Sequence, residues 1–317
     1  MVQNETYFEG SDGARLYLYR WSPEQEMPVR AVLHIVHGMA EYALRYRFLA
    51  EILTEAGIEV LAADQRGHGK TACLDINKPD KGGLLGHCAD GNGFTRVTAD
   101  IHAINEEIRK TRKAPLFLLG HSWGSFIVQN YIEYSDNINV NGCILSGTQG
   151  PVGFKVKAGV VIMSLLTMIK GQRKTSKLAK AMGDGQYSKA FKPSRTQFDW
   201  LSRDENEVDK YIADPLCGFL CSCGFYRDLT RLLYNIHRHD AMARINTNLP
   251  VYVFSGSADP VGDMGRGPTD LVKSYRDLGI TDCEFVLYPC ARHETLNETN
   301  RKEVIDNLLA WINKRCE

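Results

Sequence analysis

The sequence has no excess of charge of either sign. Its 317 residues include 38 lysines and arginines and 38 aspartates and glutamates, so the formal net charge is zero at neutral pH. A chain with balanced charge has no long-range field that attracts nucleic acid or an anionic membrane. We therefore expect no nucleic-acid partner.

Long apolar runs are also missing. The longest, Ala158 to Ile169, has 12 residues and includes Ser164 and Thr167, which is too short to cross a bilayer. Residues 1–10 include two glutamates and lack the apolar core of a secretion signal. These features favour a cytoplasmic protein.

Regular cysteine spacing is absent too. The nine cysteines are odd in number and scattered along the chain, which favours reduced thiols over a disulfide framework. Cys217, Cys221 and Cys223 form a C-x3-C-x-C cluster, but no second pair at zinc-finger spacing follows. We expect neither a metal nor a cofactor.

The sequence does contain short apolar runs that alternate with amphipathic segments. This alternation is typical of an α/β protein whose mostly parallel central sheet is flanked by helices. Two further strands, Thr6 to Phe8 and Arg15 to Trp21, are expected to form an antiparallel hairpin around Asp12-Gly13. The remaining strands are expected at Ala31 to Val36, Ile58 to Ala63, Leu116 to Leu119, Val140 to Leu145, Val251 to Ser255 and Glu284 to Tyr288. The helices are expected at about Tyr42 to Ala56, Thr95 to Thr111, Ser125 to Tyr134, Asp228 to Ala243, Thr269 to Leu278 and Thr299 to Lys314.

The alternation stops in the middle of the chain. Residues 150–224 contain an apolar segment, a basic stretch and an acidic helix near Arg203 to Ile212, but no strand signal. We interpret residues 1–149 and 225–317 as the two parts of one core and residues 150–224 as an inserted helical cap. Because Ala158 to Ile169 is apolar almost all round, its helix should be covered on more than one side.

One stretch carries the clearest chemical signal. The apolar run Leu116 to Leu119 leads directly into Gly120-His121-Ser122-Trp123-Gly124, a G-x-S-x-G pattern, and a helical pattern follows. In a nucleophile elbow the serine occupies a sharp turn between strand and helix, where glycines avoid steric clashes. The stretch therefore predicts Ser122 as a nucleophile.

Other polar residues follow the ends of predicted strands, where parallel sheets bind their ligands. A serine nucleophile needs an imidazole base and a carboxylate that orients it. His293 and Asp259 follow the last two strands, in the chain order Ser, Asp, His that α/β-hydrolases show. Asp263, four residues beyond Asp259, is the reserve candidate for the acid.

A serine hydrolase also needs donors for the oxyanion. These are normally the backbone N–H after the nucleophile and one from a loop that follows an early strand. The corresponding residues in this chain are Trp123 and Met39.

Five segments, taken together, resemble a known family. They are H-G-M-A-E-Y-A-L-R-Y (residues 37–46), D-Q-R-G-H-G-K (64–70), G-H-S-W-G-S (120–125), G-S-A-D-P-V (256–261) and R-H-E (292–294). In this order they resemble the motifs of the monoacylglycerol lipase and lysophospholipase group of α/β-hydrolases, also called serine aminopeptidase-like hydrolases. The resemblance covers the core on both sides of the insertion.

The resemblance implies an α/β-hydrolase fold with a helical cap. It also implies Ser122 as nucleophile, Asp259 as acid, His293 as base, and Met39 and Trp123 as the oxyanion hole. The chain departs from the family in residues 150–224, which do not resemble the lid of the mammalian monoacylglycerol lipase. It departs again after His293, where Glu294-Thr295-Leu296 stands in place of a second histidine. These departures concern the identity of the substrate.

The sequence favours a serine hydrolase that cleaves a small, lipid-like carboxylic ester, such as a monoacylglycerol or a lysophospholipid. We expect Met163 and Leu166 to line an acyl tunnel, and we also consider a transient contact between the cap and a membrane surface.

Two alternatives stay open. One is an aminopeptidase of the proline-iminopeptidase kind, whose substrate amino group would bind acids of the cap: Asp204, Glu205, Glu207 and Asp209. The other is a ligand-binding protein that kept the fold and lost the reaction.

Overall fold

A computed structural model of the chain describes residues 1–74, 78–134, 139–182 and 184–316, and the strands in these ranges form one eight-stranded sheet. The strand order is β1-β2-β4-β3-β5-β6-β7-β8. The pairs β1/β2 and β2/β4 are antiparallel, and the other neighbouring pairs are parallel. The predicted mostly parallel sheet and N-terminal hairpin are therefore confirmed.

The strands lie close to their predicted positions. β1 begins earlier than expected because the residues before Thr6 continue the pairing with β2 as far as Ser22. The bounds are β1 (Val2–Glu9), β2 (Arg15–Ser22), β3 (Ala31–Val36), β4 (Ile58–Ala63), β5 (Leu116–His121), β6 (Gly142–Ser146), β7 (Val251–Gly256) and β8 (Cys283–Tyr288).

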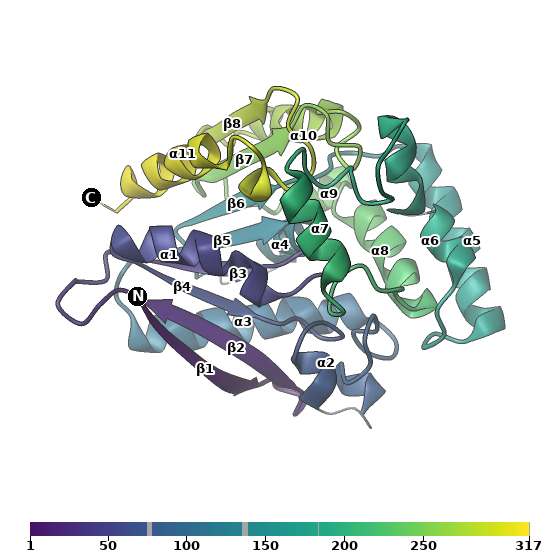
Figure 1. Ribbon diagram of the computed structural model, residues 1–317, viewed down its shortest axis with the longest axis horizontal. Coiled ribbons are helices and arrows are strands. Elements are labelled where there is room, and N and C mark those ends of the chain that lie inside the picture. The colour runs from purple at the N-terminus through teal and green to yellow at the C-terminus, as the bar shows by residue number, and fades with distance from the viewer. Residues whose placement is uncertain (75–77, 135–138, 183, 317) are drawn as a thin grey trace.

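Helices cover both faces of the sheet. α1 and α11 lie on one face, and α3, α4 and α10 lie on the other (Figure 1). The helical elements of the core are η1 (Ala43–Tyr46), α1 (Arg47–Glu55), α2 (Thr71–Leu74), η2 (Pro79–Lys81), α3 (Gly93–Thr111), α4 (Trp123–Tyr134), α10 (Arg266–Asp277), η4 (Thr295–Asn297) and α11 (Arg301–Asn313).

The central strand β5 shows how the core is built. Its alternate residues point to opposite faces of the sheet. Phe117 and Leu119 belong to the apolar cluster beneath α1 and α11, whereas Leu116 and Leu118 belong to the cluster beneath α3 and α4. A strand buried on both faces carries no polar alternation, which is why this run is continuously apolar.

Between β6 and β7 the chain leaves the sheet. The elements in this interval are α5 (Phe154–Lys170), α6 (Lys177–Met182), η3 (Asp184–Phe191), α7 (Glu205–Ala213), α8 (Cys223–Asn235) and α9 (His239–Met242). They gather beside the carboxyl edge of the parallel strands (Figure 1). The helix predicted over Asp228 to Ala243 is wrong, because the chain ends α8 at Asn235 and begins a separate short helix at His239.

The prediction that α5 would be covered on more than one side is also wrong. α5 packs on α8, and Met163 and Thr167 are buried in that contact. The side chains of Val161, Met168 and Ile169 are 60%, 75% and 78% exposed. One face of an apolar helix is therefore open to solvent at the outer edge of the molecule (Figure 1).

The structure also bears on the features that the sequence lacks. None of the nine cysteines, all of which lie in the described ranges, forms a disulfide. In the described ranges, no helix combines the length and hydropathy needed for a membrane span. The same ranges contain no group of three or more His, Cys, Asp or Glu side chains that could hold a metal ion.

Candidate active site

Ser122 occupies a strained turn between β5 and α4. Its φ is 53°, in the left-handed region that non-glycine residues rarely adopt. A Cβ at Gly120 would lie 2.5 Å from the Gly124 carbonyl oxygen, and one at Gly124 would lie 2.1 Å from the Val36 carbonyl oxygen. Both glycines are therefore required for this close approach of strand, turn and helix, and the geometry is that of a nucleophile elbow.

His293 and Asp259 are brought together by the parallel strands β8 and β7. The His293 Nδ1 atom lies 2.9 Å from Asp259 Oδ2, and both side chains are buried. The other carboxylate oxygen of Asp259 accepts the Val261 N–H at 2.8 Å. Burial is the largest single influence and disfavours the charged imidazole, but the carboxylates of Asp259, Glu294 and Glu41 together outweigh burial and hold the pKa of His293 above its usual value.

The reserve acid, Asp263, lies elsewhere. Its side chain is 52% exposed and forms an ion pair with Arg266 on the first turn of α10. The residue also has a φ of 50°, so it belongs to a tight turn. The structure thus brings Asp259, and not Asp263, to the imidazole.

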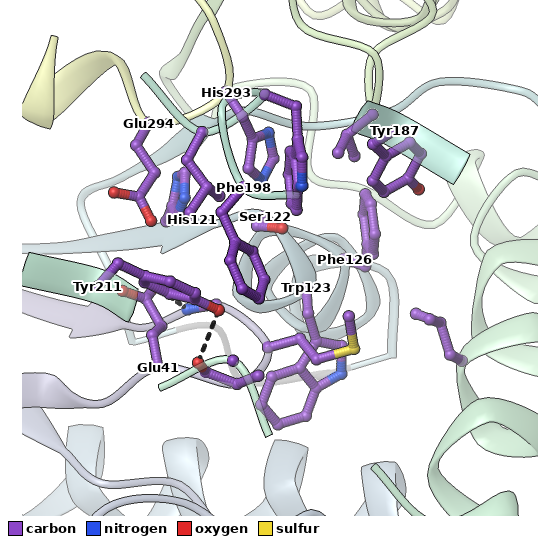
Figure 2. Close-up of a pocket in the computed structure, with 18 of the residues that line it drawn as sticks. Glu41, His121, Ser122, Trp123, Phe126, Tyr187, Phe198, Tyr211, His293 and Glu294 are labelled. Carbon is purple, nitrogen blue, oxygen red and sulfur yellow. Dashed lines mark hydrogen bonds between the residues drawn. The ribbon is translucent and has the colours of Figure 1, made fainter. Parts of the chain in front are cut away.

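The loop after β3 packs directly against the elbow. A Cβ at Gly38 would lie 3.2 Å from Ser122 Cβ, so Met39 is held beside the serine. The following residue, Ala40, has a φ of 55°, and its carbonyl oxygen accepts the Tyr211 hydroxyl at 2.9 Å (Figure 2). A residue of α7, far along the chain, therefore fixes the loop that contains Met39.

Ser122, His293, Met39 and Trp123 all line one cavity, part of which is open to solvent. The carboxylates of Glu41 and Glu294 lie on one side of Ser122, and Phe126 and Tyr187 lie on the other (Figure 2). The apolar lining consists of Met39, Trp123, Phe126, Tyr187, Phe198, Trp200, Leu201, Tyr211, Leu229 and Val261. The site is thus apolar around most of its wall and acidic in one corner.

Met163 and Leu166 were expected to line an acyl tunnel, and neither is among the described lining residues of this cavity. Met163 is buried in the core cluster, and Leu166 packs against the same cluster. The cavity receives its apolar wall from later elements, among them Leu229 on α8 and the segment Phe198–Leu201. The acyl tunnel at Met163 and Leu166 therefore stays a prediction, because a helix that is apolar all round gives no indication of which face meets a ligand.

The acids proposed to bind a substrate amino group also lie outside the cavity wall as it is described. Asp204 caps α7 by accepting the Asn206 N–H, and Glu207 forms ion pairs with Lys210 and Arg301. Glu205 and Asp209 face Arg195 at the protein surface. The contacts of these four side chains are therefore with α7 itself and with the residues packed around it.

The sequence did not single out three charged residues beside the site. Arg45 donates to Glu41 Oε2 at 2.6 Å and to both carboxylate oxygens of Glu294 at 2.7 Å. Both glutamates line the cavity. The signal was available, because Glu41 and Arg45 stand in the 37–46 motif and Glu294 follows the histidine, but only the fold shows that they meet.

His121, the variable position of the elbow, contacts His293. Its ring centroid lies 4.9 Å from that of His293. Burial, together with the positive charge that His293 can carry, lowers the pKa of His121 to about 4. His121 is therefore neutral at pH 7.

Comparison with known proteins identifies similar sequences and folds. A family model described as serine aminopeptidase, S33, matches residues 27–300. A monoacylglycerol lipase from Mycolicibacterium smegmatis is 28% identical and aligns with 98% of this chain and 97% of its own length. A protein named Phospholipase YtpA from Bacillus subtilis is 24% identical and aligns with 93% of this chain and 99% of its own length.

A solved structure shares the fold over the whole chain. The thermostable carboxyl esterase from Bacillus coagulans, crystallised in complex with glycerol, superposes with a TM-score of 0.88 at 24% identity and covers 100% of both chains. At this identity the superposition shows the fold alone. That fold is the α/β-hydrolase fold which the sequence motifs predicted.

Proposed function

We propose, starting from the fact that this chain belongs to the serine aminopeptidase S33 family of α/β-hydrolases, that it hydrolyses carboxylic esters through an acyl-enzyme. The observation that carries this proposal is the placement of a strained serine, Ser122, in one cavity with His293, which itself contacts Asp259. A serine at the elbow, a base and an orienting carboxylate are the three parts that nucleophilic acyl transfer requires.

The proposed reaction begins when Ser122 Oγ attacks the ester carbonyl carbon. Because Nδ1 of His293 faces Asp259, Nε2 is the nitrogen that takes the serine proton. The oxyanion then accepts hydrogen bonds from the backbone N–H groups of Trp123 and Met39. The C–O bond of the ester breaks, the alcohol leaves with the proton from His293, and water releases the acid in the reverse sequence.

The substrate class follows from the two sides of the cavity. The aromatic and aliphatic side chains suit an acyl chain, whose burial contributes about 0.8 kcal/mol for each methylene. The polar corner beside Glu41 and Glu294 suits the hydroxyl groups of an alcohol, because carboxylate oxygens accept hydrogen bonds from them. We therefore propose a monoacylglycerol as the substrate, with a lysophospholipid as the second candidate.

We further propose that residues 150–224 act as a cap over the site. Supporting contacts run from this segment to the loop of the base, where the N–H groups of His293 and Glu294 donate to the carbonyl oxygens of Trp200 and Leu201 at 3.3 and 2.7 Å. The exposed apolar face of α5, around Met168 and Ile169, is the surface through which the cap would make a transient contact with a membrane. Exposed apolar patches of this kind mark interaction surfaces.

A substrate panel tests the proposal. Release of fatty acid is measured from monoacylglycerols of graded chain length, from lysophospholipids of matched chain, and from an aminoacyl amide, with Ser122→Ala as the control. The proposal predicts hydrolysis of the monoacylglycerols, with a preference for long chains, and no turnover by the variant. Faster cleavage of the amide would favour the aminopeptidase alternative, and binding without turnover of any substrate would favour the ligand-binding one.

A further inference from the structure

Arg45 lies between two carboxylates that belong to different loops of the site. Its side chain is 12% exposed, and those of Glu41 and Glu294 are 4% and 6% exposed. Arg45 meets Glu294 through two parallel hydrogen bonds of 2.7 Å and meets Glu41 through one of 2.6 Å. Paired N–H donors on a carboxylate give the strongest and most directional contact that arginine makes.

Glu41 connects this arginine to the loop of the proposed oxyanion hole. Its Oε1 atom accepts the Gly38 N–H at 2.5 Å and the Tyr46 hydroxyl at 2.9 Å. Gly38 directly precedes Met39, so the orientation of the Gly38 peptide constrains the N–H that follows it. A carboxylate held by three donors has little freedom to move, and the peptide bonded to it is fixed accordingly.

Glu294 connects the same arginine to the loop of the proposed base. It follows His293 directly, and its Oε2 atom also accepts a hydrogen bond from the Asn297 side-chain amide at 2.9 Å. The chain of contacts from Gly38 through Glu41, Arg45 and Glu294 to His293 is continuous. It joins the two loops that must keep a constant separation from Ser122.

The bridge formed by Glu41, Arg45 and Glu294 also carries a net charge. Two carboxylates face one guanidinium, which leaves one negative charge beside an imidazole that must become positive during acyl transfer. Burial works against the imidazolium, and after Asp259 the carboxylates of Glu294 and Glu41 are the groups that raise the pKa of His293. The charge is thus placed where it favours the protonated base.

We propose that Glu294 is a positioning residue, which acts through Arg45 and Glu41 to hold the oxyanion loop against the loop of the base and places a negative charge beside the imidazole. This inference rests on the proposed function, because it assigns a role within the same reaction. The titration of the base distinguishes this role from that of a buried ion pair that only stabilises the fold, because removal of a purely structural pair would not change the pKa of His293.

The test is the pH profile of kcat/KM for a short soluble ester, p-nitrophenyl butyrate, with Glu294→Gln. Loss of one negative charge lowers the pKa of His293, so the acid limb of the profile should move to lower pH by about half a unit or more. The plateau kcat should fall about tenfold with little change in KM, because the variant loses the alignment of the two loops and keeps its affinity for the substrate.

Glu298→Gln is the matched control. Glu298 lies in the same loop and is fully buried, and it pairs with Arg203 and the Arg292 N–H outside the cavity. This variant should lose stability and keep the wild-type midpoint of the acid limb. If Glu294→Gln does not fold, Glu41→Gln removes the same charge from the other end of the bridge, and the same downward shift is expected.

The outcomes separate this inference from the proposed function. A wild-type protein that hydrolyses no ester, or a rate that persists in Ser122→Ala, defeats the proposed function. The positioning role alone is overturned in either of two cases in which the wild-type protein is active with a normal acid limb. In the first, the midpoint of the acid limb is the same in Glu294→Gln as in the wild type. In the second, the midpoint moves by the same amount in Glu298→Gln as in Glu294→Gln.

Discussion

Asp259 holds the imidazole of His293 by a contact of 2.9 Å between Oδ2 and Nδ1, although 34 residues separate the two in sequence. The parallel pairing of β7 with β8 explains the contact. Gly256 lies opposite Tyr288 in the register, so the two loops leave the sheet side by side, and Asp259 and His293 lie a few residues beyond that pair.

This relationship predicts a ranking of two variants. Asp259→Asn should lower kcat by about 10⁴-fold, because an amide no longer stabilises the imidazolium or its tautomer. Asp263→Asn should change kcat less than about twofold, since a half-exposed surface ion pair contributes little. Steady-state kinetics with circular dichroism as a folding control decides the ranking, and the opposite order would assign the acid to Asp263.

Much of this site could be predicted because each of its parts follows a strand. Ser122, Asp259 and His293 are each placed by a local pattern that precedes them, and a parallel sheet gathers strand ends at one edge. The Arg45–Glu294 contact could not be predicted in this way. It depends on how η1 packs against the last loop, a relation that no spacing in the sequence records.

The wall of the cavity shows a different limit of sequence reasoning. Trp200 and Leu229 come from the interval between β6 and β7. Strands and helices do not alternate there, so the sequence pattern does not predict where the elements lie. The apolar composition of α5 was the basis for predicting Met163 and Leu166 as acyl-binding residues. The structure shows that this helix packs on α8 with one face and exposes the other. Composition identifies apolar helices, but their orientation is set by tertiary contacts.

Chain-length selectivity should therefore respond to Leu229 and not to Met163. Leu229→Trp adds volume to the cavity wall and should shorten the preferred acyl chain, with a loss of roughly fourfold in kcat/KM for each methylene that no longer fits. Hydrolysis of butyrate esters should be nearly unchanged. The measurement is kcat/KM over p-nitrophenyl esters from acetate to palmitate.

Met163→Trp is the matched variant, with the same new side chain on the buried face of α5. Overpacking there should cost about 1–3 kcal/mol of stability and lower the Tm while the chain-length profile keeps its wild-type shape. A profile that shortens in Met163→Trp and stays unchanged in Leu229→Trp would return the acyl site to α5.

Glu133 predicts a dependence of stability on pH. Both of its carboxylate oxygens are buried on α4 without a hydrogen-bond partner in the described part of the chain. Burial, opposed only by the charge of Arg244, raises the pKa of Glu133 to about 10. The folded protein therefore keeps a proton that the unfolded chain releases near its ordinary pKa of about 4.3, and stability should fall as the pH rises between these values.

Glu133→Gln removes this titration. The Tm of the variant should exceed that of the wild type by more at pH 9 than at pH 5, because glutamine stays neutral in both states. Glu107→Gln, at an exposed glutamate of α3, serves as the control and should leave the pH dependence unchanged. Parallel Tm curves for wild type and Glu133→Gln would show that Glu133 is ionised in the folded protein.

The most direct test of the central proposal is the site of covalent labelling by a long-chain fluorophosphonate, which reacts only with an activated serine. We predict one adduct per chain, located by tandem mass spectrometry on Ser122, absent in Ser122→Ala and reduced by orders of magnitude in His293→Ala. A chain that folds but takes no label, or an adduct on any other residue, would contradict the assignment of Ser122 as the nucleophile.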